Sequence, residues 1–208
     1  MERVFILLEG GNVDLNQFNF NKNDIFICAD GGIKRILDRK LKNKIIYIGD
    51  FDSVEKEVIK KYNFEIKEFS KDKNKTDGEL AIEYTCKNFN KNIKKIIIGG
   101  ITDRLDHTIG NILVCIPKIK EGHKFEFYGD KIKCYLASKS ITLETRINNK
   151  ISLIALEKIS NAQTSGLKWE LKNEDIFSYN SRTLRNESIK SLVKVKFDKG
   201  ILMIIETW

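Results

Sequence analysis

The sequence lacks the segments that direct a chain into a membrane. No apolar run in its 208 residues approaches the roughly 18 residues of a membrane span. The N-terminal segment is a short apolar run closed by an acid and two glycines, with no small-residue cleavage site, so we expect a first buried strand and not a signal peptide. A hydrophobic content of 41% supports a packed core and excludes wholesale disorder. This length allows one large domain or two small ones.

Cysteine and histidine are scarce, which argues against a zinc site or a disulfide framework. No two cysteines have the C-x-x-C spacing, and His107 and His123 are the two histidines that could act as imidazole ligands. We therefore expect reduced thiols in a cytoplasmic protein. The cysteines are Cys28, Cys86, Cys115 and Cys134.

Three common catalytic fingerprints are also missing. The sequence has no G-x-x-x-x-G-K-[S/T] loop and no G-x-G-x-x-G fingerprint, which disfavours P-loop and Rossmann dinucleotide-binding proteins. It has no G-x-S-x-G elbow, which disfavours an α/β-hydrolase.

The net charge is +8, from 37 basic and 29 acidic side chains. Residues 1–130 hold 23 basic and 21 acidic residues, whereas residues 131–208 hold 14 and 8, so most of the excess lies in the second part. Neither part has a block of five or more like charges, which indicates a bias of overall composition and not a designed basic patch. We expect no nucleic-acid partner, although a basic nucleic-acid-binding module stays open as an alternative.

Residues 1–130 alternate short apolar runs with longer mixed segments, a pattern typical of a mostly parallel α/β sheet covered on both faces. The expected strands are Val4–Leu8, Ile25–Ala29, Ile45–Ile48, Ile96–Ile98 and, more weakly, Phe64–Phe69 and Phe125–Tyr128. The expected helices are Ile33–Asp38, Glu55–Tyr62, Asp77–Phe89 and Arg104–Lys118.

Residues 131–208 are β-rich and lack a helical period, which predicts a small antiparallel β-sandwich. No proline- or serine-rich linker separates the two parts, so we expect them to pack rigidly. The expected strands are Ile132–Ala137, Ser140–Thr145, Ile151–Leu156, Ser191–Phe197 and Ile201–Thr207.

Carboxylates follow four successive strands of the first part, where each strand ends. They are Asp30; Asp50 and Asp52; Asp72 and Asp77; and Asp103 and Asp106. The carboxyl ends of parallel strands share one rim, where ligands bind, so we expect these acids to converge on one crevice. A cation is needed to relieve their repulsion, and Mg²⁺ fits because it takes oxygen ligands and shares them with phosphates.

Residues near the rim suit the binding of both a metal ion and phosphate. Asp50 and Asp52 lie two positions apart, which in extended backbone puts both side chains on one side and suits a shared metal. The neighbouring glycines let backbone amides approach phosphate. Positive charge for the phosphates comes from Lys73, Lys75 and Arg104. The glycines are Gly31, Gly32, Gly49, Gly99 and Gly100.

The same residues could have local roles. Thr76 and Glu79 match a helix capping box, a role that does not exclude Asp77 from binding metal. Asp103 could cap the helix that holds Arg104. In that helix Arg104, His107 and Asn111 share one face near the start, where anions are favoured.

Taken together, these motifs resemble those of the thiamine pyrophosphokinase family. The matching segments are Ala-Asp-Gly-Gly from Ala29, Gly-Asp-Phe-Asp-Ser from Gly49, Asp-Lys-Asn-Lys-Thr-Asp from Asp72, Gly99-Gly100, Arg-Leu-Asp-His-Thr from Arg104, Asn111, and Gly-Leu-Lys-Trp from Gly166. The resemblance spans most of the chain in the right order. It implies an α/β catalytic domain over 1–130, a β-sandwich over 131–208 that contributes to thiamine binding and dimerisation, and a homodimer.

The resemblance also implies an activity and a set of site residues. Family members transfer the pyrophosphoryl group of ATP to the hydroxyl of thiamine with Mg²⁺ and release AMP. Metal would lie at Asp50, Asp52 and Asp77, with phosphates near Lys73, Lys75 and Arg104, and Asp106 would orient or deprotonate the hydroxyl. Further substrate-binding positions would be Asp30, Gly31, Thr76, His107, Asn111, Trp169 and Asn186.

The second part would supply the thiamine ring contact. Thiamine would lie between the α/β domain of one subunit and the sandwich of the other, and Trp169 could stack on its cationic ring or instead be a core residue. The Ser-Asn of the family appears here as Arg185-Asn186, so a cation, Arg185, would lie near this site.

Three other functions stay open at this point. A related fold pyrophosphorylates a neutral hydroxymethylpterin, which would tolerate Arg185 better than thiamine would. A Mg²⁺-dependent phosphohydrolase would use Asp50 as its nucleophile and need no acceptor. A nucleic-acid-binding module would show salt-sensitive binding that survives Asp52→Asn.

Overall fold

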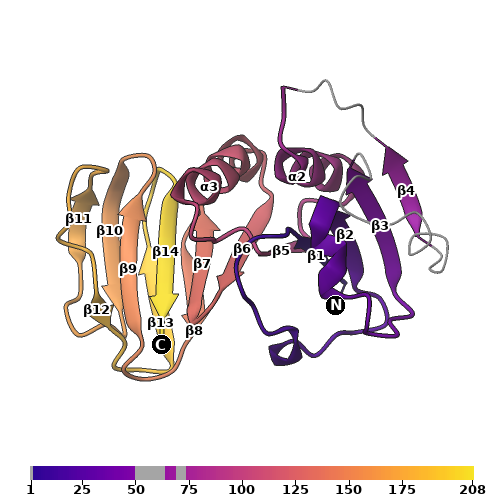
Figure 1. Cartoon of the computed structure of the whole chain (residues 1–208). Helices are drawn as coiled ribbons and strands as arrows, with labels where there is room; N and C mark the ends of the chain where they lie inside the picture. Colours follow the sequence, from indigo (N-terminus) through magenta and orange to yellow (C-terminus); the bar gives the residue numbers. More distant parts are fainter. Residues whose placement is uncertain (1, 50–63, 69–73) are drawn as a thin grey trace. The chain divides into compact units, whose positions relative to one another are not determined.

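The structure is a computed structural model that describes residues 2–49, 64–68 and 74–208 (Figure 1). The contacts divide the chain into two compact units, Met1–Asp130 and Lys131–Trp208. The predicted helix Glu55–Tyr62 and the site candidates Asp50, Asp52 and Lys73 lie outside the described residues. Among the helices of the described segments, none is long and apolar enough to cross a membrane.

The first unit is built on a parallel sheet, which confirms the predicted α/β class. Its strand order is β6-β5-β1-β2-β3-β4, and every neighbouring pair is parallel. The chain therefore builds the sheet outward from β1 in one direction and then returns to build it in the other. The strands are β1 (Arg3–Leu7), β2 (Ile25–Ala29), β3 (Lys44–Gly49), β4 (Glu65–Glu68), β5 (Lys94–Ile98) and β6 (Lys124–Gly129).

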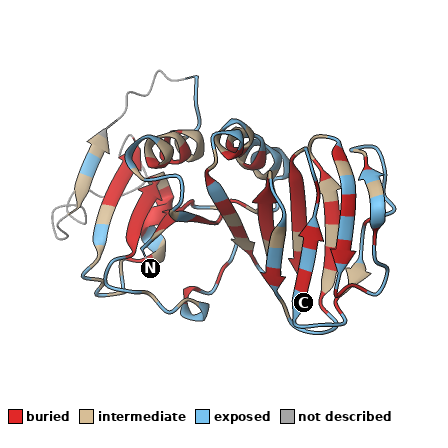
Figure 2. Ribbon diagram, turned by 180° about the vertical axis from the view of Figure 1, so that it is seen from behind, coloured by how far each residue is buried: buried red, intermediate tan, exposed pale blue. Residues whose placement is uncertain are grey.

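Both faces of this sheet are covered, as the continuous apolar runs predict. On one face Phe5, Leu7 and Phe26 pack with residues of the two 3-10 helices η1 (Leu15–Gln17) and η2 (Asp30–Arg35). On the alternate positions, Val4, Ile6 and Ile27 are also buried, and helix α2 (Asp77–Asn88) packs against β1, β2 and β3 (Figure 2). The strand ends are thus held by a rigid core.

Helices α2 and α3 follow strands β4 and β5 along the chain. Helix α2 (Asp77–Asn88) begins at the N-cap Thr76, whose Oγ1 accepts a hydrogen bond from the amide of Glu79 at 3.2 Å, so the predicted capping role of Thr76 is confirmed. Helix α3 (Leu105–Lys120) has Arg104 at its N-cap, without a side-chain cap bond. The prediction that Asp103 caps this helix is therefore wrong.

One predicted helix of the first unit has a different form. The segment expected as a helix over Ile33–Asp38 is the 3-10 helix η2, which starts earlier, directly at the end of β2. The cause is close packing: a Cβ on Gly32 would overlap the carbonyl oxygen of Leu7, and one on Gly31 would overlap the Glu9 carboxylate. The chain can turn this tightly because both positions are glycine.

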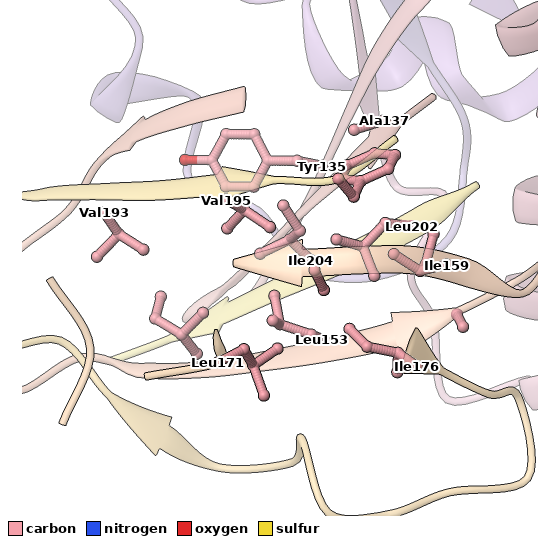
Figure 3. Packing of buried hydrophobic residues seen from close by; sticks show 14 of the residues in the cluster. Tyr135, Ala137, Leu153, Ile159, Leu171, Ile176, Val193, Val195, Leu202 and Ile204 are labelled. Atoms are coloured by element: carbon pink, nitrogen blue, oxygen red, sulfur yellow. The ribbon is translucent and has the colours of Figure 1, made fainter. Parts of the chain in front are cut away.

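The second unit contains two antiparallel sheets, in the orders β12-β9-β14-β7 and β11-β10-β13-β8. Alternate side chains of both sheets form one core, with Leu153, Val195 and Ile204 pointing inward (Figure 3). This confirms the predicted antiparallel sandwich. The strands are β7 (Ile132–Ala137), β8 (Ile141–Glu144), β9 (Lys150–Ala155), β10 (Ile159–Ser165), β11 (Lys172–Ile176), β12 (Asn186–Glu187), β13 (Leu192–Lys196) and β14 (Leu202–Thr207).

Three of these strands, β10, β11 and β12, do not appear in the sequence pattern. In β10 the buried positions Ile159 and Ala162 lie three apart because a register shift interrupts the ladder between them, and Asn161 there has φ 55°. The family-matching segment 166–169 is not part of a strand and holds one isolated bridge, from Leu167 to Ser188.

Candidate active site

A cavity of about 470 Å³ lies in the first unit at the carboxyl ends of its strands. It is lined by the loops after β1, β2 and β5 and by the first turns of α2 and α3. Strand order reverses between β1 and β5, and the crevice outside such a reversal is where open α/β sheets bind ligands. The volume is within the range of about 300–1,000 Å³ for small-molecule sites.

Six of the predicted site residues line this cavity together: Asp30, Thr76, Asp77, Arg104, His107 and Asn111. Arg104, His107 and Asn111 lie together because residues three, four and seven positions apart are on one face of a helix, here α3. Asn111 also donates from Nδ2 to the carbonyl of Gly100 at 3.2 Å, which ties α3 to the loop after β5. The sequence therefore predicted much of this wall.

The cavity wall is rich in carboxylates. Asp30, Asp77 and Asp103 line it as their positions at strand ends predict, and Glu9 does so as well. Glu9 follows β1 as the other acids follow their strands, and that position is the signal by which the sequence could have revealed it. Its carboxylate is 3.1 Å from the Lys34 ammonium, and both side chains are exposed.

The negative charge of this wall favours the binding of a cation. Among the described residues, four carboxylates line the cavity, and Arg104 is the permanently charged base of this lining. Hard oxygen donors of this kind are the ligands that Mg²⁺ takes. Within residues 2–49, 64–68 and 74–208, no group of three or more His, Cys, Asp or Glu side chains is arranged to hold a metal ion. The predicted ligands Asp50 and Asp52 fall outside those ranges.

Arg104 and Asp106 form an ion pair at the start of α3. The guanidinium donates to the carboxylate from Nη2 at 2.6 Å and from Nε at 3.3 Å. This hydrogen bond lowers the pKa of Asp106 below its usual range and raises the pKa of Arg104. Asp106 is therefore ionised at neutral pH, but its side chain is exposed and is not among the residues that line the cavity, so its predicted catalytic role stays a prediction.

Other predicted residues of the first unit lie apart from the cavity lining. The Lys75 ammonium is 2.5 Å from a Glu83 oxygen and 3.5 Å from Glu79, which raises its pKa. Gly31 is buried beneath the Glu9 carboxylate. Their roles in binding phosphate stay predictions.

A second, smaller cavity of about 90 Å³ lies in the sandwich unit. Its wall combines four apolar residues with four polar ones. The apolar residues are Leu153, Trp169, Leu171 and Leu184, and the polar ones are Glu170, Arg182, Thr183 and Asn186. The volume is well below the roughly 300 Å³ at which complete ligand pockets begin, so this cavity can take only part of a ligand.

Trp169 is 59% exposed, so the possibility that it is a core residue is excluded within this chain. The Lys168 ammonium lies 5.0 Å from the centroid of its ring, in a cation–π contact. Trp169 therefore presents an indole surface that already attracts a cation.

Asn186 holds the backbone of Trp169 from both sides. Its Nδ2 donates to the Trp169 carbonyl at 2.6 Å, and its Oδ1 accepts from the Trp169 amide at 3.1 Å. The side-chain amide of Asn186 thus both lines the cavity and binds the backbone of Trp169.

The cation of this wall is not the one that the sequence suggests. Arg185, at φ 55°, is exposed and does not line the cavity, whereas Arg182 does. The Arg182 guanidinium forms an ion pair with the Glu174 carboxylate, which offsets its charge. The charge conflict expected from Arg185 is therefore absent from this cavity wall.

Fold and site together define an α/β unit with an acid-rich ligand cavity at its topological switch point, followed by a β-sandwich with an aromatic surface. Comparison with known proteins then identifies the family. Residues 17–127 match the family model described as thiamin pyrophosphokinase, catalytic domain, and residues 139–202 match that described as thiamin pyrophosphokinase, vitamin B1 binding domain. The chain belongs to the thiamine pyrophosphokinase family, as its motifs predict.

Curated relatives and solved structures agree with this assignment. A thiamine pyrophosphokinase of Bacillus subtilis is 27% identical over 194 residues, which cover 90% of this chain and 89% of the relative. Thiamine pyrophosphokinase 2 of Arabidopsis thaliana is 25% identical over 206 residues, covering 86% and 76%. The crystal structure of thiamine pyrophosphokinase from Bacillus subtilis shares the fold, with a TM-score of 0.83 at 23% identity over 100% of this chain and 99% of that one. The comparisons support neither the pterin nor the nucleic-acid alternative.

Proposed function

We propose that this protein transfers the pyrophosphoryl group of ATP to the hydroxyl of thiamine, giving thiamine pyrophosphate and AMP. The observation that carries the proposal is the acid-rich cavity at the switch point of the sheet, in a chain that matches both domains of the thiamine pyrophosphokinase family. In this reaction the thiamine oxygen bonds to the β-phosphorus of ATP. The bond from that phosphorus to the oxygen shared with the α-phosphate breaks, and AMP leaves.

In the first unit, phosphoryl-type transfer requires positioning and charge neutralisation more than covalent chemistry. Arg104 at the start of α3 and the exposed first turn of that helix favour the phosphates. Asp106, ionised and fixed by Arg104, orients the attacking hydroxyl, whose proton passes to solvent as the oxygen–phosphorus bond forms.

Mg²⁺ is part of the proposal because oxygen donors dominate the wall. Asp77 would hold it together with Asp50 and Asp52, and it would neutralise charge on the transferred phosphates. Asp77 meets this requirement in position, since it lines the cavity at the first residue of α2.

In the second unit, the thiamine ring would be held by Trp169. A thiazolium cation suits an exposed indole that already contacts the Lys168 ammonium, because both cations are attracted to the electron-rich ring face. We further infer a homodimer in the cytoplasm, as the family resemblance and the unpaired thiols suggest.

Product analysis tests the proposal directly. Purified protein with ATP, Mg²⁺ and thiamine should yield AMP and thiamine pyrophosphate in equal amounts, measured by chromatography and by ³¹P NMR. A parallel reaction offers hydroxymethylpterin instead of thiamine, and another offers no acceptor. AMP formation with the pterin but not thiamine, release of phosphate without an acceptor, or ADP as the nucleotide product would each overturn it.

A further inference from the structure

Arg35, in η2, directs its guanidinium at four successive backbone carbonyls of the loop after β1. Nε donates to the carbonyl of Leu8 at 2.7 Å, and Nη2 donates to those of Glu9 at 3.0 Å and Gly11 at 2.6 Å. The same nitrogen also donates to Gly10. One side chain thus fixes the backbone of the whole turn.

A guanidinium suits this role for a physical reason. It carries donors in a rigid planar fork, so it can bind several acceptors at once, which the rotating ammonium of lysine does less well. Burial lowers the pKa of Arg35 while the nearby Glu9 carboxylate raises it, and the group stays charged. Its hydrogen bonds are therefore charge-assisted.

The loop that Arg35 holds forms part of the candidate active site. Leu8, Glu9 and Gly10 all line the large cavity of the first unit. Within the described parts of the chain, the amide of Gly10 donates to no protein acceptor, whereas its carbonyl is bound to Arg35. A backbone amide left in this state at a cavity is a donor for an anionic ligand.

The loop after β5 packs against the same arrangement. Gly99 has φ 80°, and a Cβ at this position would overlap the carbonyl oxygens of Leu8 and Gly10 and lie 2.8 Å from Arg35 Nη2. Gly99 also lines the cavity. The loop after β5 is therefore packed against the Leu8 and Gly10 carbonyls that Arg35 binds. A shift of either loop would disturb these hydrogen bonds.

From these contacts we propose that Arg35 is a positioning residue for pyrophosphoryl transfer, which sets the backbone of residues 8–11 as the nucleotide-facing wall of the cavity. It acts through that loop and touches no substrate. The inference rests on the proposed function, because the wall matters for catalysis only if ATP binds in this cavity.

The test compares Arg35→Ala and Arg35→Lys with a matched control, Arg39→Ala. Arg39 lies four residues further along, and its guanidinium donates to Asn16 Oδ1 at 2.9 Å, away from the cavity lining. We expect Arg35→Ala to lower kcat/KM for ATP by about 100-fold and Arg35→Lys by about tenfold, since a misplaced reacting group of about 1 Å has effects of this size. KM for thiamine and the activity of Arg39→Ala should stay close to wild type.

Two readouts separate positioning from a general loss of structure. Guanidinium ions at a non-denaturing concentration should restore part of the activity of Arg35→Ala, because a free guanidinium can reoccupy the space, whereas ammonium ions should not. Hydrogen exchange of the Leu8 amide, which donates to the carbonyl of Ile98 at 2.8 Å, should be faster in Arg35→Ala and slower again with guanidinium.

Each outcome decides the matter. Wild-type kcat/KM in Arg35→Ala, a loss that affects ATP and thiamine equally, or unchanged exchange of the Leu8 amide would overturn the inference. If Arg35→Ala does not fold, Arg35→Lys decides, and wild-type kcat/KM for ATP in that variant is the contradicting result. If wild type and Arg39→Ala form no AMP from ATP and thiamine, the proposed function fails, while the exchange result still shows whether Arg35 fixes the loop.

Discussion

The two cavities of this molecule differ in size, charge and the way their walls are held. The cavity of the α/β unit measures about 470 Å³, and the described residues that line it include four carboxylates, an arginine and a histidine on loops and helix starts. The cavity of the sandwich unit measures about 90 Å³, has a wall that is half apolar and half polar, and presents an exposed tryptophan. Phosphate chemistry requires the first environment, whereas a flat cationic ring requires the second.

The difference teaches how each fold positions its polar groups. Parallel strands end at one rim, so a single sheet brings Asp30, Asp77 and Asp103 together from distant parts of the sequence. The sandwich offers no such rim, and it positions Trp169 by binding its backbone to the side-chain amide of Asn186. The first three of the following predictions test whether the two substrates divide between the two units in this way, and the fourth tests whether the two units differ in their response to acid.

The largest expected effect is on the acidic wall. Asp77→Asn should lower kcat by about 1,000-fold, because the charge that holds a metal near the transferred phosphates is lost. The thermal unfolding temperature should change little, since Asp77 is a first-turn residue of α2 and Thr76 still caps the helix. The matched control is Asp38→Asn, an exposed carboxylate of the same unit outside the cavity lining. Equal loss in both variants would contradict a specific role for Asp77.

A smaller effect is expected on the aromatic surface. Trp169→Ala should raise KM for thiamine by about tenfold, the size of a desolvated cation–π contact, and leave KM for ATP nearly unchanged. Trp208→Phe is the matched control, because Trp208 is also exposed, at 48% against 59% for Trp169, but does not line the cavity. Steady-state kinetics with each substrate varied in turn measure both values. A rise in KM for ATP would show that the two units do not divide the substrates.

Loss of the two hydrogen bonds between Asn186 and the Trp169 backbone should have a still smaller effect on thiamine binding. Asn186→Ala removes two hydrogen bonds to the Trp169 backbone, so KM for thiamine should rise by about fivefold, near the value of one net hydrogen bond. In a Trp208→Phe background the fluorescence of Trp169 should shift to longer wavelength as its backbone loosens. An unchanged spectrum together with raised KM would mean that Asn186 binds thiamine itself.

The smallest effect is on stability in mild acid, which should lower the free energy of unfolding of the first unit before that of the second. Burial, and then the Lys95 ammonium, lower the pKa of His123 from its ordinary 6.5, so the folded unit resists protonation while the unfolded chain takes up the proton. The stabilising contribution is present above pH 6.5 and is lost as the pH falls below it. In the second unit the lowered pKa values belong to acids such as Asp175, which titrate only at lower pH.

Urea unfolding at about pH 7.5 and about pH 5.5 measures this effect. His123→Phe, which places an apolar ring beside Phe125, should lose less stability over that interval than wild type does. Equal pH dependence in the two proteins would assign the change to other groups.

Sequence patterns predicted the parts of this molecule that follow from short-range physics. Continuous apolar runs located the parallel strands, and acids at their ends located the cavity wall, because topology alone brings them together. The strand β11 escaped detection since its Lys-Asn-Glu-Asp sequence has little apolar character, and β10 escaped because its register shift breaks the alternation.

Contacts to the backbone were beyond sequence reasoning. Arg35 binds carbonyls of residues 8–11, and Asn186 binds the amide and carbonyl of Trp169. Any residue type can supply these partners, so no side-chain pattern marks them. The ion pair of Lys75, which precedes α2, with Glu83 in that helix likewise follows from side-chain placement and not from motif spacing.

The division of substrates between the two units is tested most directly by equilibrium binding. Isothermal titration calorimetry would measure the affinities of wild type, Asp77→Asn and Trp169→Ala for thiamine and, separately, for Mg²⁺ with an ATP analogue whose α,β-bridging oxygen is a methylene group. We predict a crossed result: Asp77→Asn loses affinity for the analogue and keeps that for thiamine, whereas Trp169→Ala shows the reverse. Loss of both affinities in either variant, in protein that unfolds at the wild-type temperature, would contradict the account.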